Sequence, residues 1–226
     1  MPLVFAMAAM ACWSQDTYYW YNAVSTEDYC RYYIPDRDIG YDWITPGFDD
    51  SGWTYAQSGI GYGDGDDNTV IQEGVYSLYL RYSFGVTDGA NVKQVILDMD
   101  YDDGFVAYLN GVEIASGNIT KPYSWNMLLD RDHEAALFRG LLPERWIIND
   151  AQMNEALVAG ENILAVEIHN HQPTSSDMSS NTFLHIGFSE QQNGYKNVMD
   201  WFVPPVTLKS HLPIINISTN GVAIPD

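Results

Sequence analysis

The sequence has 226 residues, of which 46% are hydrophobic, enough for one sizeable folded domain with flanking segments. It carries 10 basic and 30 acidic residues, a net charge of −20. This balance repels phosphate and anionic lipid, so it excludes nucleic acid and an anionic membrane surface as partners. Such an excess is typical of a solvated acidic surface, with cation binding as the alternative interpretation.

The first feature in chain order is an apolar run over residues 2–11, which ends in Ala9-Met10-Ala11. Its length and small residues fit a signal peptide with its cleavage site, and it is too short to span a bilayer. No lysine or arginine precedes it. We therefore predict that residues 1–15 are a signal peptide with a truncated start, which makes the protein secreted or attached to the cell surface. The alternative is a buried N-terminal strand.

The two cysteines are Cys12 and Cys30, and no Cys-x-x-Cys pair occurs, which excludes a zinc site built on thiolates. In an exported protein they could form one disulfide. Alternatively, Cys12 is removed with the signal peptide or carries a lipid.

Residues 16–33 are rich in tyrosine and tryptophan. Such side chains can stack on sugar rings, but they are also good strand formers that pack at the edge of a sandwich. Packing is the favoured interpretation because no spacing places the rings on one face.

A glycine-rich loop is predicted over residues 58–69, where four glycines at every second position alternate with acids and rule out a helix. Its oxygen-bearing side chains could bind Ca²⁺. It is not an EF-hand, because Thr69 stands at the invariant glycine position and no glutamate closes the frame. The alternative is an ordinary loop with Asx turns. The candidate calcium ligands are Asp64, Asp66, Asp67 and Asn68.

Residues 75–86 and 92–99 follow as strands with alternating apolar residues. In the first strand, Leu78, Leu80, Tyr82 and Phe84 are expected to face one way and Tyr79 and Arg81 the other.

Residues 98–115 predict a strand, a tight acidic turn, a second strand, a two-residue hairpin at Asn110-Gly111 and a third strand, a pattern typical of a β-sandwich. Asp102 and Asp103 lie in the acidic turn. A glycosidase needs two carboxylates about 5–10 Å apart on opposite sides of a bond, which neighbours on a turn do not supply by themselves. We expect them to cap backbone N–H groups or to hold a cation.

Residues 118–141 are predicted to form long loops, and Trp125, after Tyr123, is a candidate platform for stacking on a sugar. A tryptophan folded onto the sandwich is the alternative. Residues 149–157 then predict a short helix with Asn149 as its N-cap, which ends at Gly160.

Residues 161–170 form the second strong strand pattern, with Glu167 and His169 on the face away from the core. His185 lies on the next strand, and if the two strands were neighbours these three side chains could converge on a metal. Polar histidines on a solvated sheet face are the alternative. No serine-hydrolase elbow, zinc-protease, dinucleotide-binding or kinase motif occurs. Residues 191–209 have the composition of a linker.

Several segments together resemble a galactose-binding-domain-like jelly-roll module of secreted bacterial multidomain proteins. They are Asp49-Asp-Ser-Gly-Trp53, Gly59-Ile-Gly-Tyr-Gly-Asp64, Leu78-Tyr-Leu-Arg81, Tyr101-Asp-Asp-Gly-Phe-Val-Ala-Tyr-Leu-Asn-Gly111, Gly160-Glu-Asn-Ile-Leu-Ala-Val-Glu-Ile-His-Asn170 and Ser175-Ser-Asp177. Residues 210–226 are similar to the opening strand of a CotH-type (spore-coat-protein-H-like) kinase domain, whose catalytic residues would lie beyond Asp226.

The resemblance covers about residues 44–190 and implies an all-β jelly-roll β-sandwich with one short helix and long loops, a module that we assign to residues 16–190. It implies a non-catalytic module, often carbohydrate-binding and often carrying a structural Ca²⁺, that is accessory to a larger protein. A structural spacer or protein-docking domain is the first alternative, and a hydrolase using Asp102, Asp103 or the histidines is the second. The candidate ligand-binding residues are Tyr62, Asp102, Asp103, Tyr123, Trp125, His169 and Asn170.

Overall fold

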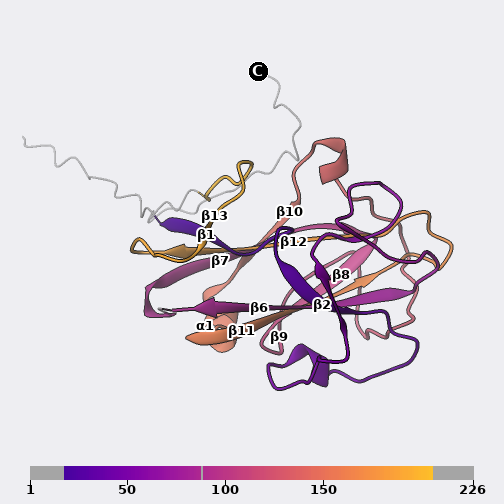
Figure 1. Ribbon diagram of the computed structural model, residues 1–226, viewed down its shortest axis with the longest axis horizontal. Helices are drawn as coiled ribbons and strands as arrows, with labels where there is room; N and C mark the ends of the chain where they lie inside the picture. Colours follow the sequence, from indigo (N-terminus) through magenta and orange to yellow (C-terminus); the bar gives the residue numbers. More distant parts are fainter. Residues whose placement is uncertain (1–17, 88, 206–226) are drawn as a thin grey trace, which may run out of the picture. The chain divides into compact units, whose positions relative to one another are not determined.

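The computed structural model describes residues 18–87 and 89–205, whose strands form two antiparallel sheets in two layers and one short parallel pair (Figure 1). One sheet has the order β10 (Glu144–Ile148), β7 (Val92–Asp102), β12 (Ser179–Phe188), β1 (Tyr19–Val24), β13 (Lys196–Asn197). The other has the order β3 (Thr54–Gln57), β2 (Tyr29–Tyr33), β6 (Ser77–Val86), β11 (Gly160–His169), β8 (Gly104–Leu109), β9 (Val112–Gly117). The parallel pair is β4 (Ile60–Gly61) with β5 (Thr69–Val70), and the helices are η1 (Asp42–Ile44), η2 (Gly89–Asn91), η3 (Leu137–Arg139) and α1 (Asp150–Ala156). The predicted all-β jelly-roll sandwich with one short α-helix is confirmed.

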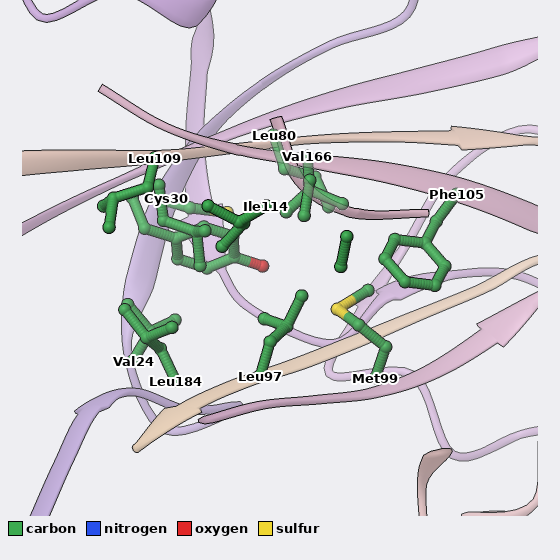
Figure 2. Packing of buried hydrophobic residues seen from close by; sticks show 14 of the residues in the cluster. Val24, Cys30, Leu80, Leu97, Met99, Phe105, Leu109, Ile114, Val166 and Leu184 are labelled. Carbon is green, nitrogen blue, oxygen red and sulfur yellow. The ribbon is translucent and has the colours of Figure 1, made fainter. Parts of the chain in front are cut away.

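The core lies between the two sheets, because alternate residues of each strand point to the same face. Figure 2 shows Leu97 and Met99 of β7 pointing toward Leu80, Phe105 and Val166 of the opposite sheet. All five are 0% exposed. Each such side chain contributes about 1.5–3 kcal/mol of burial free energy, so this layer supplies most of the driving force for folding.

The chain changes sheets at the acidic turn. β7 pairs with β10 and β12, whereas β8 pairs with β11 and β9, so Asp102 and Asp103 connect the two layers and do not close a hairpin. The predicted two-residue hairpin between β8 and β9 is confirmed. Asn110 has φ 50° and Gly111 has φ 93°, and positive φ at both positions is what a type I′ turn requires.

The outer face of the six-stranded sheet is covered by aromatic side chains from loops. Trp43 is 0% exposed and stacks on Tyr79 of β6, with ring centroids 4.4 Å apart. Arg81, two residues farther along β6, is 3% exposed and donates to the carbonyls of Trp43 and Thr45 and to Asp50. Tyr79 and Arg81 thus lie on the predicted face, but that face is buried.

The α-helix begins as predicted. The Asn149 side chain accepts a hydrogen bond from the backbone N–H of Gln152 at 3.0 Å, which satisfies one of the free donors of the first turn. The predicted end at Gly160 is wrong: the helix ends at Ala156 with Leu157 as its C-cap, and Gly160, with φ 96°, begins β11.

The compact unit runs from Tyr18 to Phe202. This compact unit includes residues 191–202, which we predicted to be part of a linker. Within them, β13 pairs with β1, and the centroid of the Phe202 ring lies 4.2 Å from that of the His185 ring. Cys30 is a buried free thiol. In the described part of the chain no helix is long and apolar enough to cross a membrane. The predicted signal peptide (1–15), Cys12 and the CotH-like tail (210–226) lie outside the described residues.

Candidate functional site

Three aspartates share one face of β7 because they occupy alternate positions. Asp98 binds the guanidinium of Arg145 through both carboxylate oxygens, at 2.8 Å each. Asp100 accepts backbone N–H groups of Ala136 (2.5 Å) and Leu137 (3.2 Å), which positions the loop before η3. Asp102 is 2% exposed, and its Oδ1 has no hydrogen-bond partner among the described residues. The first two carboxylates are therefore compensated and the third is not.

The nearest charges around Asp102 are all negative. One carboxylate oxygen each from Asp102, Glu134 and Asp177 lie within 4.8 Å of one another. Burial raises the pKa of Asp102 to about 9, with further contributions from the charges of Asp103, Asp177 and Glu134. These carboxylates come from the end of β7 and from the loops that precede η3 and β12, so the fold brings together segments far apart in the sequence.

The glycine-rich loop joins this group through Asp64. Burial raises the pKa of Asp64 to about 6, and the charges of Asp177 and Asp66 contribute less to this rise. Burial also raises the pKa of Asp67 to about 7. Asp64 Oδ2 and Asp66 Oδ1 are buried with no partner in the described part of the chain. We call Asp64, Asp102, Glu134 and Asp177 the acidic cluster.

Two glycines allow the loop to approach the cluster. A Cβ on Gly61 would lie 1.9 Å from the carbonyl oxygen of Met178, and one on Gly63 would lie 2.5 Å from Cβ of Asp177. No other residue permits this backbone contact. Asn68, predicted as a cation ligand, has another role: its Nδ2 donates to the carbonyls of Thr26 (3.1 Å) and Ser58 (2.8 Å), which closes the loop.

Asp103 connects backbone segments and is not part of the cluster. Its Oδ1 accepts the N–H of His133 at 2.8 Å and its Oδ2 accepts the N–H of His171 at 2.6 Å. This agrees with the expectation that the acids of the turn cap N–H groups or hold a cation: Asp103 caps, and Asp102 is left free.

Besides Asp102 and Asp103, three more of the predicted ligand-binding residues are buried. Tyr62 is 2% exposed, and its hydroxyl accepts a hydrogen bond from Nδ2 of Asn170, itself 0% exposed, at 2.9 Å. His169 is also 0% exposed, with its Nε2 3.3 Å from Oε2 of Glu167. None of these side chains has a surface open to a ligand.

The predicted convergence of the histidines is wrong. His169 lies on β11 in the six-stranded sheet, whereas His185 lies on β12 in the five-stranded sheet, 3.1 Å from Asp98. The hydrophobic core separates the two strands. Both rings are 0% exposed, so the expectation of a solvated sheet face is wrong as well, and the Phe202 ring covers His185.

The predicted stacking residues lie on a loop over the six-stranded sheet. Trp125 is half-buried and meets Tyr76 edge-on at 5.8 Å, and its carbonyl accepts a hydrogen bond from Ser77 Oγ at 2.6 Å. Tyr123 donates to Glu113 at 3.3 Å. Trp125 and Tyr123 therefore hold the loop in place, with part of each ring exposed.

A groove that the sequence did not indicate crosses the other end of this outer face. It has a volume of about 390 Å³, within the usual range of ligand pockets. At its rim, Tyr29 and Tyr55 are 55% and 62% exposed and stack with centroids 5.3 Å apart, and the Arg31 guanidinium lies 5.0 Å from the Tyr55 centroid. We call it the tyrosine groove; the lining residues used below are Tyr29, Arg31, Asp50, Tyr55, Arg81 and Glu161.

The groove contains charges of both signs at fixed positions. Arg81 Nε donates to Oδ2 of Asp50 at 2.7 Å, and Ser83 Oγ donates to Oε1 of Glu161 at 2.8 Å. The signal in the sequence was the alternation of Tyr29 and Arg31 on one face of a strand. That alternation does not predict the groove by itself, because the third residue, Tyr55, lies next to them only once β3 pairs with β2. In that pairing Tyr55 lies opposite Arg31.

No model of a protein family matches the sequence, and no curated protein matches it. Among solved structures, the chain is similar to a β-glucuronidase from Bacteroides uniformis, at 15% identity and a TM-score of 0.47, over 74% of this chain and 18% of that one. It is also similar to a β-glycosidase from Bacteroides vulgatus (14%, 0.45, over 74% and 20%) and to a Bifidobacterium dentium β-glucuronidase complexed with coumarin-3-O-glucuronide (15%, 0.45, over 69% and 21%). The chain thus spans about a fifth of the length of these enzymes, and likeness at this level does not extend to activity or substrate.

Proposed function

We propose that the unit from Tyr18 to Phe202 is a non-catalytic module that binds glycan in the tyrosine groove. The observation that carries this proposal is the pair of exposed, stacked tyrosines at the rim of a polar groove. The same groove offers both apolar stacking surface and hydrogen-bonding groups, the two kinds of contact that a sugar ring requires.

A sugar ring has an apolar C–H face and an edge of hydroxyl groups that both donate and accept. Exposed tyrosine rings supply apolar area together with a polar tip. Arg31 supplies donors only, and the carboxylates of Asp50 and Glu161 supply acceptors only, so hydroxyls of either polarity find partners there. Because Arg81 holds Asp50 and Ser83 holds Glu161, little ordering is left to binding, which favours affinity.

The non-catalytic part of the proposal is supported by the arrangement of the acids. Asp102 and Asp103 are adjacent in the chain, and each oxygen of Asp103 already accepts a backbone N–H. Such a pair does not flank a bond from opposite sides, as glycoside hydrolysis requires.

We further propose that the module is secreted or held at the cell surface and is continuous with other domains. This part rests on the signal-peptide pattern of residues 1–15 and on the CotH-like pattern of residues 210–226.

The test is binding of the protein to a panel of immobilised polysaccharides and surface glycans. We expect Tyr55→Ala to weaken binding by about two- to thirteenfold, since one stacked ring contributes about 0.5–1.5 kcal/mol beyond the area that it buries. Tyr19→Ala is the matched control: Tyr19 is 45% exposed but lies on β1, in the opposite sheet, and its loss should change nothing.

A Trp125→Ala variant distinguishes the groove from the loop that the sequence indicated. Loss of binding in Trp125→Ala and not in Tyr55→Ala would contradict the groove. If no glycan of the panel binds, the glycan-binding function is refuted and the spacer or docking-domain alternative stands.

A further inference from the structure

The acidic cluster contains a buried carboxyl group with no compensating partner. Asp102 is 2% exposed, its Oδ1 has no hydrogen-bond partner in the residues described, and the charges that act on it are all acidic. Isolating a carboxylate from water costs several kcal/mol unless a counter-charge or hydrogen bonds replace the lost solvation. Asp98 and Asp100 on the same face of β7 have such partners.

The spacing of the cluster fits one large cation. Oxygens that bind Ca²⁺ lie about 2.3–2.6 Å from it, so two ligands of one ion are at most about 5 Å apart. The oxygens contributed by Asp102, Glu134 and Asp177 are all within 4.8 Å of one another. From these observations we infer that the sandwich binds a Ca²⁺ ion between Asp102, Glu134 and Asp177, with Asp64 of the glycine-rich loop completing the carboxylate set. This inference is independent of glycan binding.

Backbone hydrogen bonds to the sandwich hold the loops that carry Glu134 and Asp177 in place. The backbone before Glu134 is fixed by the bond from His133 N–H to Asp103, and the backbone after it by the bond from Ala136 N–H to Asp100. Next to Asp177, Met178 exchanges two backbone hydrogen bonds with Tyr62, at 2.9 and 3.0 Å. The ligands are thus positioned before an ion arrives, which lowers the ordering cost of binding.

The donor set selects the type of ion. The cluster offers carboxylate oxygens, which suit Ca²⁺ and Mg²⁺; zinc favours histidine nitrogen and thiolate. The histidine nearest in the chain, His133, is engaged through both ring nitrogens, with Glu144 at 2.8 Å and the Tyr101 carbonyl at 3.0 Å. Mg²⁺ requires a compact octahedron at about 2.0–2.1 Å, whereas Ca²⁺ tolerates a wider, irregular set such as this one. The ion would tie the glycine-rich loop to the loops before η3 and β12.

The test is calorimetric titration of the chelator-treated protein with CaCl₂, together with melting in EDTA and in about 5 mM Ca²⁺, above the usual dissociation constants of extracellular modules. We expect a single class of site and a melting temperature several degrees higher in Ca²⁺. Asp102→Asn and Glu134→Gln should each weaken binding at least tenfold. In EDTA, Asp102→Asn should melt at or above the wild-type temperature, because the amide replaces a buried carboxyl group that has no compensating partner.

The matched control is Asp130→Asn, an exposed acid of the same loop outside the cluster. It should bind Ca²⁺ as the wild type does. Absence of Ca²⁺ binding, equal affinity for Mg²⁺, or wild-type affinity in Glu134→Gln would overturn the inference. If Asp102→Asn does not fold, Glu134→Gln decides the question alone, since its side chain is exposed.

Discussion

Arg81 anchors the aromatic loop on the outer face of the six-stranded sheet, and Arg81→Met tests that role. The substitution keeps most of the side-chain volume but removes the donors to Asp50 and to the carbonyls of Trp43 and Thr45. Removing one partner of a buried ion pair costs about 3–5 kcal/mol. Because the Asp50 side chain is 27% exposed and can regain some water, the lower end applies, about 3 kcal/mol. In a unit of this size that corresponds to a fall of about 6–12 °C in melting temperature.

The assay is thermal unfolding followed by near-ultraviolet circular dichroism, which reports on the stacked Trp43 and Tyr79 rings. Arg37→Met is the matched control, since the side chain of Arg37 is 74% exposed and lies 3.8 Å from an equally exposed carboxylate. It should leave the melting temperature unchanged. A fall of less than about 2 °C in Arg81→Met would show that apolar packing alone holds the loop, and would refute the anchoring role of Arg81.

Three further predictions concern local features. Asn149→Ala should cost about 1 kcal/mol of unfolding free energy by removing the N-cap of α1, seen as a fall of about 2–4 °C in melting temperature. Gly61→Ala should destabilise by more than this because its Cβ would meet backbone at 1.9 Å, whereas Gly47→Ala, with nothing within 4 Å, should be neutral in the same melt. Burial lowers the pKa of His185 below its ordinary value of 6.5, partly opposed by a neighbouring carboxylate. Below about pH 6.5 the unfolded chain therefore binds more protons at this residue and stability falls with decreasing pH; denaturant titrations between pH 7 and 5 should show a shallower fall in His185→Gln.

Features set by local chain geometry could be predicted from the sequence. Two-residue periodicity indicated the strands and their core faces, the Asn110-Gly111 pair indicated the type I′ turn, and Asn149 marked the helix start. Each depends on neighbours within a few residues, so the information is contained in one stretch of chain.

The assignment of strands to sheets could not be predicted in the same way. A tight turn such as Asp102-Asp103 can close a hairpin or carry the chain from one layer to the other, and only the pairing partners of β7 and β8 distinguish the two. Alternation places His169 on the outer face, but it does not reveal that Trp43 and its loop cover that face.

The candidate cation site was predicted in part. The acid-rich loop with Asp64 indicated oxygen ligands, and Asp102 was recognised as a possible holder of a cation. Glu134 and Asp177 carry no local mark because they lie on separate loops that meet only in the folded sandwich. The tyrosine groove escaped prediction for the same reason.

The most direct test of the central claim is a nuclear magnetic resonance titration of the isotope-labelled protein with the oligosaccharide unit of a glycan that it binds. Binding in the tyrosine groove predicts shift changes concentrated at Tyr29, Arg31 and Tyr55 on β2 and β3, with β10 and α1 unaffected. Changes centred instead on the loop of Tyr123 and Trp125, or no changes at saturating sugar, would contradict it.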